Sequence, residues 1–265
     1  MQKTILITGS TDGIGLETAK MLTSLGHHVL LHGRNPKKLE QVQKMLLELK
    51  DGGPVEIYVA DLSLMDNVQV LGKTVMEKHS KLDVLINNAG VYNASDPITQ
   101  DGLDIRFAVN TMAPYLLTQK LLSLLGTSGR VINLSSAAQS TVQAEALAGR
   151  VKLSDGAAYA QSKLALTMWS RSLAVSLEDN GPMIVAINPG SMLGSKMVKQ
   201  AFGVAGGDIR IGAEILTRAA LTDEFQTASG KYFDNDLGQF ASPHPDALDI
   251  RKCQEIVRVI ETVLA

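Results

Sequence analysis

The chain has 265 residues, a formal charge of −2 and 45% apolar residues, which fits a globular protein with one large α/β domain or two small ones. No basic stripe indicates a nucleic-acid partner, and no acidic tail indicates a charged one. The single cysteine, Cys253, excludes an internal disulfide, and the lack of a CxxC or Cys/His cluster argues against a metal site.

Membrane and export signals are also missing from the sequence. The longest apolar runs fall far short of the ~20 residues that span a bilayer. The first strand is expected to start by Thr4, which leaves no room for a signal peptide. We therefore expect a cytoplasmic protein with no membrane partner.

A glycine-rich turn follows the first predicted strand, residues 4–8, and precedes an apolar-periodic helix closed by Gly26. Gly9 lets the chain turn sharply, Gly13 lets the backbone approach a pyrophosphate, and Gly15 permits close helix–strand packing. The alternative is a tight turn without a ligand, and the spacing departs from the usual fingerprint because three residues, not one, separate the first two glycines. The predicted dinucleotide contacts are Gly9, Ser10, Gly13, Ile14 and Gly15.

The second predicted strand, residues 28–32, ends where such a site meets the adenosine ribose. Arg34 follows it, and an arginine there accommodates a 2′-phosphate, whereas an acidic residue would bind the 2′-hydroxyl. NADP(H) is therefore the preferred cofactor, with NAD(H) as the alternative. Asp12 argues against this preference because a carboxylate near a phosphate is unfavourable, and an ordinary loop arginine is the other explanation. Asn35 is a further predicted cofactor contact and, with Pro36, predicts a helix start.

Small and polar residues end the third and fourth predicted strands, residues 55–60 and 82–86. After the third strand, Asp61 is expected to meet the adenine amino group, and Ser63 with Asp66 predicts a cap for the next helix. After the fourth, small residues and side-chain amides suit a flat cofactor close to the backbone, or mark a simple turn. The predicted cofactor contacts are Asp61, Leu62, Asn88, Ala89 and Gly90.

A long helical pattern covers residues 101–125 and is interrupted by Asn110. A polar side chain in an apolar helix needs partners, so we expect Asn110 to bend the helix and hold a water. The helix is apolar around much of its circumference, which predicts contact with deep core or with another subunit. The five histidines have no acid or metal partner nearby and are interpreted as bystanders.

Tyr159 and Lys163 stand four residues apart, on one face of a predicted helix over residues 159–177. An ammonium beside a phenol favours the phenolate. A free tyrosine has a pKa of about 10, so its use as a base near neutral pH needs about 4 kcal/mol of differential stabilisation. Lys163 supplies part of this, and a cationic cofactor ring and a hydroxyl donor would supply the rest. Alone the pair is a weak signal, because the same spacing on a solvated helix usually has no function.

The fifth predicted strand, residues 130–136, ends in a serine pair and completes an ordered set of motifs. The set consists of TGxxxGIG from Thr8 to Gly15, NNAG from Asn87 to Gly90, Asn110, Ser136, and YxxxK from Tyr159 to Lys163. Together these motifs resemble the classical short-chain dehydrogenase/reductase (SDR) family over about residues 3–200. The resemblance implies an α/β fold with one doubly wound (Rossmann) parallel sheet and helices on both faces, in a single domain over residues 1–265.

The resemblance also implies catalytic roles for four side chains. Tyr159 would exchange a proton with the substrate oxygen, and Lys163 would bind the nicotinamide ribose and lower the Tyr159 pKa. Ser136 would hold the substrate oxygen, with Ser135 as its competitor. Asn110 would position a water that joins Lys163 to solvent. This arrangement is typical of hydride transfer at CH–OH and C=O groups.

Two departures from the family pattern concern the substrate and the nicotinamide. Ser136 and Tyr159 are 23 positions apart, which is similar to the retinol dehydrogenase-like branch and places residues 137–158 at the substrate mouth. The family's PG motif is present after the sixth predicted strand. The family usually has a threonine shortly after it that binds the carboxamide, and the nearest candidate here, Ser195, falls about one residue late. The predicted cofactor contacts here are Pro189 and Gly190.

The last part of the chain is predicted to hold a glycine-rich lid or linker over residues 191–208, a helix from Asp208 to about Ala220, and a strand over residues 230–234. A C-terminal helix has an apolar stripe that includes Cys253, so we expect this thiol to be buried. We expect a carbonyl reductase or alcohol dehydrogenase acting on a small molecule. The alternatives are a non-catalytic dinucleotide sensor or scaffold, an enoyl reductase and an epimerase. A homodimer or homotetramer would form through the two long apolar helices.

Overall fold

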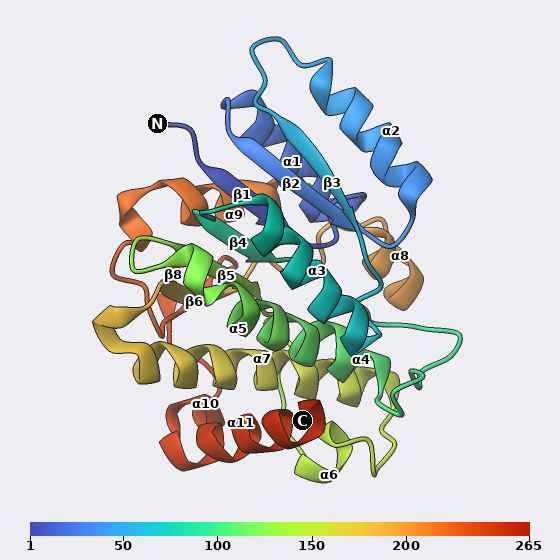
Figure 1. The fold of residues 1–265 in the computed structure, drawn as a ribbon. Coiled ribbons are helices and arrows are strands. Elements are labelled where there is room, and N and C mark those ends of the chain that lie inside the picture. Colours follow the sequence, from blue (N-terminus) through green and yellow to red (C-terminus); the bar gives the residue numbers. More distant parts are fainter.

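One eight-stranded sheet forms the centre of the computed structural model, which describes residues 1–265 (Figure 1). The strand order is β3-β2-β1-β4-β5-β6-β7-β8, and every pair is parallel except β7 with β8. This order confirms the predicted doubly wound α/β sheet. The antiparallel edge strand β8 was not predicted, because three residues are too few to show a period. The strands are β1 (Thr4–Ile7), β2 (His28–Gly33), β3 (Val55–Val59), β4 (Val84–Asn87), β5 (Arg130–Leu134), β6 (Met183–Asn188), β7 (Tyr232–Asp234) and β8 (Gln239–Ala241).

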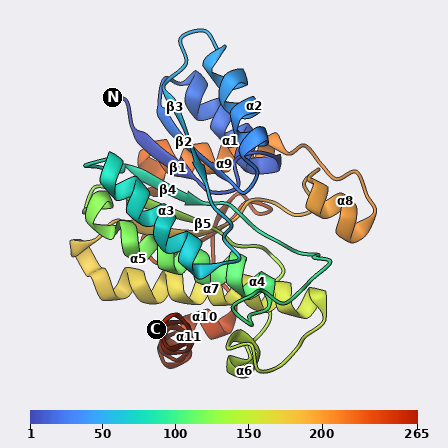
Figure 2. The ribbon, with the colours of Figure 1, turned by 45° about the vertical axis from the view of Figure 1, so that its right-hand side comes forward.

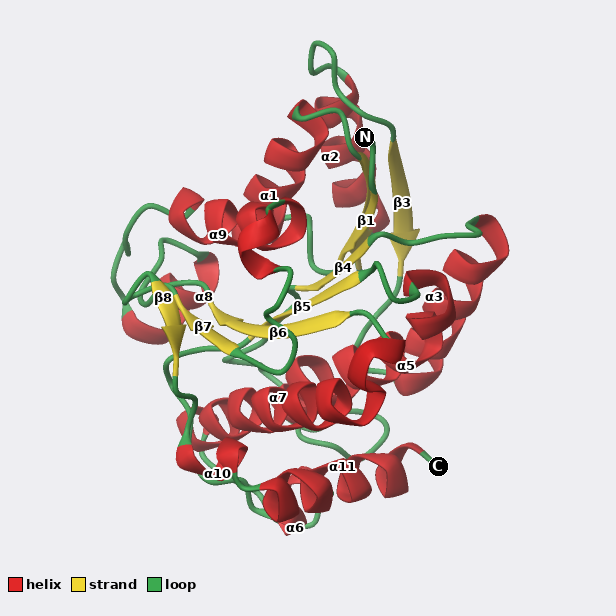
Figure 3. Ribbon diagram, turned by 90° about the vertical axis from the view of Figure 1, so that its left-hand side faces the viewer, coloured by secondary structure: helices red, strands yellow, loops and turns green.

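Successive side chains of each inner strand enter two separate cores. Leu6 of β1 packs into one core, whereas Ile5 and Ile7 pack into the other. Strand side chains alternate between faces, so a strand that is apolar throughout requires cover on both faces. Figure 3 shows that cover, with α1, α2 and α9 on one face and α3, α5 and α7 on the other. These helices are α1 (Gly13–Ser24), α2 (Pro36–Leu47), α3 (Met65–Lys78), α5 (Ala113–Leu125), α7 (Asp155–Leu177) and α9 (Arg210–Leu221).

Helix starts were predicted with mixed success. Asn35 caps α2 as predicted, accepting a hydrogen bond from the Lys38 N–H at 3.1 Å. The predicted Ser63/Asp66 cap of α3 is wrong, because the Ser63 hydroxyl donates to Asp61 at 2.7 Å instead. The first N–H of α3 is satisfied by Asp101, 36 residues further along the chain, at 3.0 Å. A partner so distant in sequence leaves no local signal.

The helical pattern predicted over residues 101–125 divides into three parts. After the short helix α4 (Ile105–Phe107), a π-helical turn covers Ala108–Met112 and continues into α5. Asn110 lies within the π-helical turn, at the position where the sequence predicted an interruption of the helix. Pro114 explains the defect, because proline has no N–H to donate to the carbonyl four residues earlier, which is that of Asn110.

The C-terminal helix α11 (Ile250–Leu264) packs along α7 on the side away from the sheet (Figure 1). Its buried face includes Cys253, as predicted, together with Ile256 and Ile260. A hydrogen bond of 2.7 Å from the Tyr115 hydroxyl to Glu261 also ties α5 to α11. The chain's own last helix therefore covers one face of α7, one of the two helices through which assembly was predicted, and an oligomer that used this face would have to displace α11.

Three short helices complete the fold. α6 (Ala144–Leu147) lies in the stretch assigned to the substrate mouth, and α10 (Pro245–Leu248) precedes α11. α8 (Lys196–Phe202) interrupts the predicted loop over residues 191–208, and Figure 2 shows it standing out from the body beyond the carboxyl ends of the strands. None of the helices combines the length and the apolar character that crossing a bilayer demands.

Candidate active site

A cavity of about 840 Å³ lies at the carboxyl ends of the parallel strands. Its lining comes from the segments after β1, β2, β3, β4, β5 and β6, and from α4, α7 and α8. β1 and β4 are neighbours in the sheet, and their following helices cover opposite faces (Figure 3). Such a switch point opens a crevice outside the strand ends, where doubly wound folds bind ligands.

Two glycines of the turn after β1 have neighbouring atoms so close that a side chain would not fit. Gly9 has a φ of +66°, and an added Cβ would lie 2.9 Å from the Cα of Ala89. A Cβ on Gly15 would lie 2.4 Å from both the Gly9 carbonyl oxygen and the Asn88 amide nitrogen. The predicted close helix–strand packing at Gly15 is therefore present. Gly9 and Gly13 bring bare backbone to the cavity, and Thr11, Asp12 and Ile14 of the same turn line it beside them.

The turn after β4 is fastened to the glycine turn. The Asn88 side chain donates to the carbonyl oxygens of Thr8 and Gly9, at 2.8 and 3.0 Å, and the Thr8 hydroxyl accepts from the N–H groups of Asn88 and Ala89. Ala89 and Gly90 line the cavity with this pair of turns. The predicted contact residues Asn88, Ala89 and Gly90 thus come together with Gly9 at one wall.

Ser10 and His32 differ from their predicted roles. Ser10 is fully buried, and its hydroxyl exchanges hydrogen bonds with the backbone of His32 instead of facing the cavity. The His32 ring accepts from the Gly9 N–H through Nδ1 at 3.2 Å, and burial lowers its pKa to about 4. This neutral ring holds the glycine turn and lines the cavity, so it is not a bystander. Its position inside an apolar strand gave no signal of this contact.

Three other histidines have an acid partner, contrary to the prediction: His244 lies 3.6 Å from Asp246, and His28 and His79 share one that is distant in sequence. Glu56 of β3 lies 3.0 Å from the His28 ring nitrogen and 3.5 Å from that of His79. Glu56, His28 and His79 meet near the amino ends of the strands, away from the cavity, and no cluster suited to a metal ion exists in the chain.

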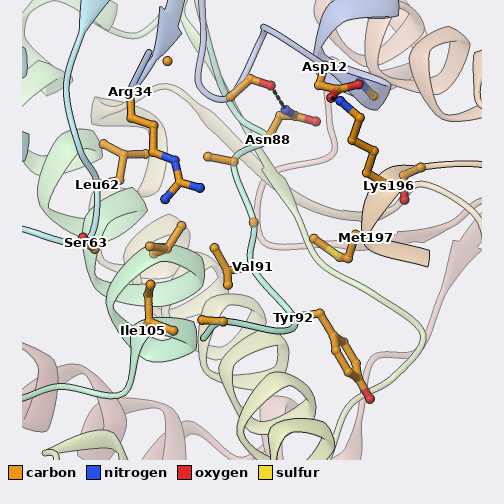
Figure 4. Close-up of a pocket in the computed structure, with 18 of the residues that line it drawn as sticks. Asp12, Arg34, Leu62, Ser63, Asn88, Val91, Tyr92, Ile105, Lys196 and Met197 are labelled. Atoms are coloured by element: carbon orange, nitrogen blue, oxygen red, sulfur yellow. Dashed lines mark hydrogen bonds and ion pairs between the residues drawn. The ribbon is translucent and has the colours of Figure 1, made fainter. Parts of the chain in front are cut away.

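Positive charge gathers at the end of the cavity near β2. Arg34 is exposed, and Figure 4 shows its guanidinium pointing into the cavity, whose lining also includes Lys38. Asp61 and Leu62 line the same end, although Asp61 is already hydrogen-bonded to Ser63. Asn35 does not line the cavity, since its side chain is used as the α2 cap. Two free cations at this end suit a phosphate group.

Tyr159 and Lys163 meet at the opposite end of the cavity, both from α7. The Lys163 ammonium donates to the Leu134 carbonyl at 2.7 Å and lies 5.7 Å from the centre of the Tyr159 ring. Burial lowers the pKa of Lys163 to about 8. Burial also raises the pKa of Tyr159, and a hydrogen bond from Ser136 opposes that rise. In the protein without a cofactor, the pKa of Tyr159 is therefore raised and not lowered, contrary to the expected effect of Lys163.

The serine pair divides into one occupied and one available hydroxyl. The Ser135 hydroxyl is buried and lies 2.7 Å from the Thr167 hydroxyl, so it is used within the core. The Ser136 hydroxyl accepts from the Ala138 N–H at 3.1 Å. It lies close enough to Tyr159 to lower the pKa of that phenol, although the cavity lining includes Ser135 and not Ser136. Ser136 thus retains a proton to donate beside the phenol, which favours it over Ser135.

Asn110 connects the turn after β4 to α7. Its side chain accepts from the Val91 N–H at 2.8 Å and donates to the Val91 carbonyl and to the Ser162 hydroxyl, both at 3.0 Å. The side chain is thus fully engaged and has little capacity for a water. The carbonyl of Asn110 is the other candidate to hold a water, because Pro114 has no N–H to donate to it.

A buried arginine that the sequence did not single out fixes the entrance of the site. Arg106 of α4 is 1% exposed, pairs with Asp104 at 2.6 Å and with Asp155 at 2.5 Å, and donates to the Tyr92 carbonyl. Asp155 begins the helix that carries Tyr159. Arg106 therefore joins the start of this helix to the segment after β4.

Two aromatic residues extend from Tyr159 to α8. The Tyr92 ring lies 4.8 Å from that of Tyr159 and 5.4 Å from that of Phe202, centre to centre. Pro189 and Ser195 line the cavity nearby, and the Ser195 hydroxyl caps α8 by accepting from Val198. Neither aromatic residue was predicted, since spacing does not reveal which rings meet.

The remaining predicted contacts have backbone roles. Gly13 and Ile14 line the cavity, whereas Gly15 and Gly190 do not. Gly190 has a φ of +118°, which a side chain would disfavour.

The fold and this crevice define a doubly wound α/β protein of the dinucleotide-binding type. A model of the family described as short chain dehydrogenase matches residues 3–203. Retinol dehydrogenase 13 of Homo sapiens is 31% identical, with 93% of this chain and 80% of that protein covered. Polyprenol dehydrogenase of Homo sapiens is 33% identical, with 87% and 76% covered. A short chain dehydrogenase from Burkholderia cenocepacia, solved in complex with NADP, is 25% identical with a TM-score of 0.70, and 88% of this chain and 95% of that chain are covered.

The chain therefore belongs to the short-chain dehydrogenase family, in its retinol dehydrogenase-like branch. Membership of this family makes it an oxidoreductase by class. The predicted family and fold are confirmed by these matches.

Proposed function

We propose that this protein is an NADP(H)-dependent oxidoreductase that interconverts a ketone or aldehyde and an alcohol. The observation that supports this most strongly is the meeting of Tyr159 and Lys163 in a cavity whose other end presents Arg34 and the glycine turn, with Ser136 beside Tyr159. The glycine turn after β1 fits the cofactor, because a pyrophosphate can approach the backbone only where no Cβ blocks it. When bound, the dinucleotide supplies or accepts the hydride.

In the reductive direction, Tyr159 donates its phenolic proton to the carbonyl oxygen. Ser136 donates a second hydrogen bond to the same oxygen and fixes its position against the phenol. Because burial raises the Tyr159 pKa, the phenol keeps its proton at neutral pH in the protein alone and is ready to act as an acid. Oxidation requires the deprotonated phenolate of Tyr159. Cationic charge bound nearby must then lower the pKa of this phenol.

Reprotonation of Tyr159 needs a path to solvent. Lys163 lies beside the phenol, and its low pKa allows it to release a proton more readily than an exposed lysine. We propose that a water held by the Asn110 carbonyl links Lys163 to solvent. The turn of residues 90 and 91 lies between them, since a Cβ on Gly90 would be 3.6 Å from the Lys163 ammonium and 3.5 Å from the Asn110 side-chain oxygen.

The cofactor preference is tested by Arg34→Ala. We expect the Kd for NADPH to rise about tenfold or more, because a charge-assisted contact to the 2′-phosphate is lost, whereas the Kd for NADH should change less than about twofold. Fluorescence titration with each cofactor measures both. Lys37→Ala is the matched control, since Lys37 is exposed but does not line the cavity. Equal losses for both cofactors would remove the argument for NADP.

The reaction itself is tested by a screen for NADPH oxidation over aldehydes, ketones and quinones, with NADH in parallel. Turnover of a carbonyl with NADPH supports the proposal. Dinucleotide binding without turnover of any carbonyl would favour the sensor or scaffold, and turnover restricted to enoyl substrates would favour an enoyl reductase. The single domain over residues 1–265, the cytoplasmic location and the homo-oligomeric state stay predictions of the sequence.

A further inference from the structure

The segment that carries α8 is a loop closed at a narrow neck. Leu193 and Gly207 form a parallel bridge, and the Gly194 N–H donates to the Gly207 carbonyl at 2.7 Å. A Cβ on Gly194 would lie 2.8 Å from that same oxygen, so the neck depends on glycine. Residues 194–207 therefore extend from the body as one unit, as Figure 2 shows for α8.

This unit contacts the cavity at two separate points. At the start of α8, the Lys196 ammonium pairs with the Asp12 carboxylate at 2.5 Å (Figure 4). At the end of α8, Phe202 packs on Tyr92, which in turn packs on Tyr159. The segment thus spans the cavity from the glycine turn to the catalytic end.

Asp12 places a negative charge where the cofactor's pyrophosphate is expected. One carboxylate oxygen caps α1 by accepting from the Gly13 N–H at 2.9 Å, and the other accepts from Lys196. Burial raises the pKa of Asp12, but these two hydrogen bonds and the charges of Lys196 and Lys38 lower it overall, so the group is ionised. A bound pyrophosphate beside Asp12 would experience repulsion unless a cation lies between them.

We propose that Lys196 is a cofactor-binding residue that exchanges Asp12 for the pyrophosphate when a dinucleotide binds. The inference rests on the proposed NADP(H) function. The ammonium side chain is 69% exposed and flexible, so it can turn from one anion to the other without moving the neck. Asp12 then weakens dinucleotide binding, because its carboxylate competes with the pyrophosphate for the Lys196 ammonium.

A double-mutant cycle on the full-length protein separates this proposal from simple neutralisation of Asp12. NADPH binding is measured by fluorescence for wild type, Lys196→Met, Asp12→Asn and the double variant. Asparagine caps helices as well as aspartate, so Asp12→Asn removes the charge and keeps the cap. We expect Lys196→Met to weaken binding about tenfold and Asp12→Asn to tighten it about threefold.

The decisive comparison is the effect of Lys196→Met when residue 12 is already asparagine. If Lys196 contacts the cofactor, its loss still weakens binding about tenfold in that background. If Lys196 only neutralises Asp12, its loss has no effect there, and the proposal is overturned. Lys199→Met, an exposed lysine on the same helix that does not line the cavity, is the control and should leave the Kd unchanged.

Chymotrypsin cleavage after the half-exposed Phe202 gives a second readout that does not depend on catalysis. NADPH should slow this cleavage in wild type and in Asp12→Asn, because Lys196 then holds α8 to the cofactor, but not in Lys196→Met. Equal protection of all three variants would overturn the proposal. Wild type that binds no dinucleotide at all would instead refute the proposed function, and the inference with it.

Discussion

Replacing Tyr159 with phenylalanine is expected to lower kcat by about 10²- to 10⁴-fold, the usual contribution of a positioned acid or base. The substitution removes one oxygen and keeps the ring that packs on Tyr92. The Kd for NADPH should stay within about twofold, because the glycine turn and Arg34 are untouched. Single-turnover kinetics with an accepted carbonyl substrate and fluorescence titration with NADPH measure the two quantities.

Tyr92→Phe is the matched control for this experiment. Figure 4 shows the Tyr92 hydroxyl pointing away from the other labelled residues of the cavity, so its loss should change kcat only a few-fold. A Tyr159→Phe enzyme that retained a large part of its activity would contradict the assigned proton transfer. A large loss in both variants would show that the aromatic packing, and not the phenolic proton, limits the reaction.

Replacing Arg106 with methionine is expected to destabilise the protein by about 3–5 kcal/mol, because it leaves the partners of a buried ion pair without their cation. Asp104 is nearly as buried as Arg106, so its carboxylate would stay desolvated. At roughly 2–4 °C per kcal/mol for a chain of this size, the Tm should fall by about 10 °C. Thermal unfolding followed by circular dichroism checks this value.

Arg150→Met provides the comparison for an exposed ion pair. Arg150 pairs with Glu145, and both side chains are more than half exposed, so the Tm should hardly change. Arg106→Lys should recover only part of the stability, because an ammonium cannot form the bidentate contact with Asp104. A Tm for Arg106→Met equal to that of wild type would show that the network contributes little to folding.

The sequence predicted the sheet and identified the candidate residues of the site because both depend on local patterns. Short apolar strands alternating with periodic helices determine a doubly wound sheet, whereas helix ends, the short strand β8 and the short helices α6, α8 and α10 were missed. The glycine turn was identified because strand, glycines and helix are contiguous in the chain. Tyr159 and Lys163 were identified because a helix brings residues four apart to one face.

Other features depended on contacts between residues that are far apart in the chain. His32 holds the glycine turn, and Asp12 pairs with a lysine 184 positions away. The raised pKa of Tyr159 also belongs here, because it results from burial that the motif does not encode.

The sequence by itself therefore determined the family, the doubly wound class of the sheet and the candidate catalytic residues Tyr159 and Lys163. Only the tertiary structure decided the charge states of those residues, the two contacts of α8 with the cavity, and the cover of α7 by α11. The physical reason is that periodicity and capping act over a few residues, whereas desolvation and ion pairing depend on which surfaces the completed fold brings together.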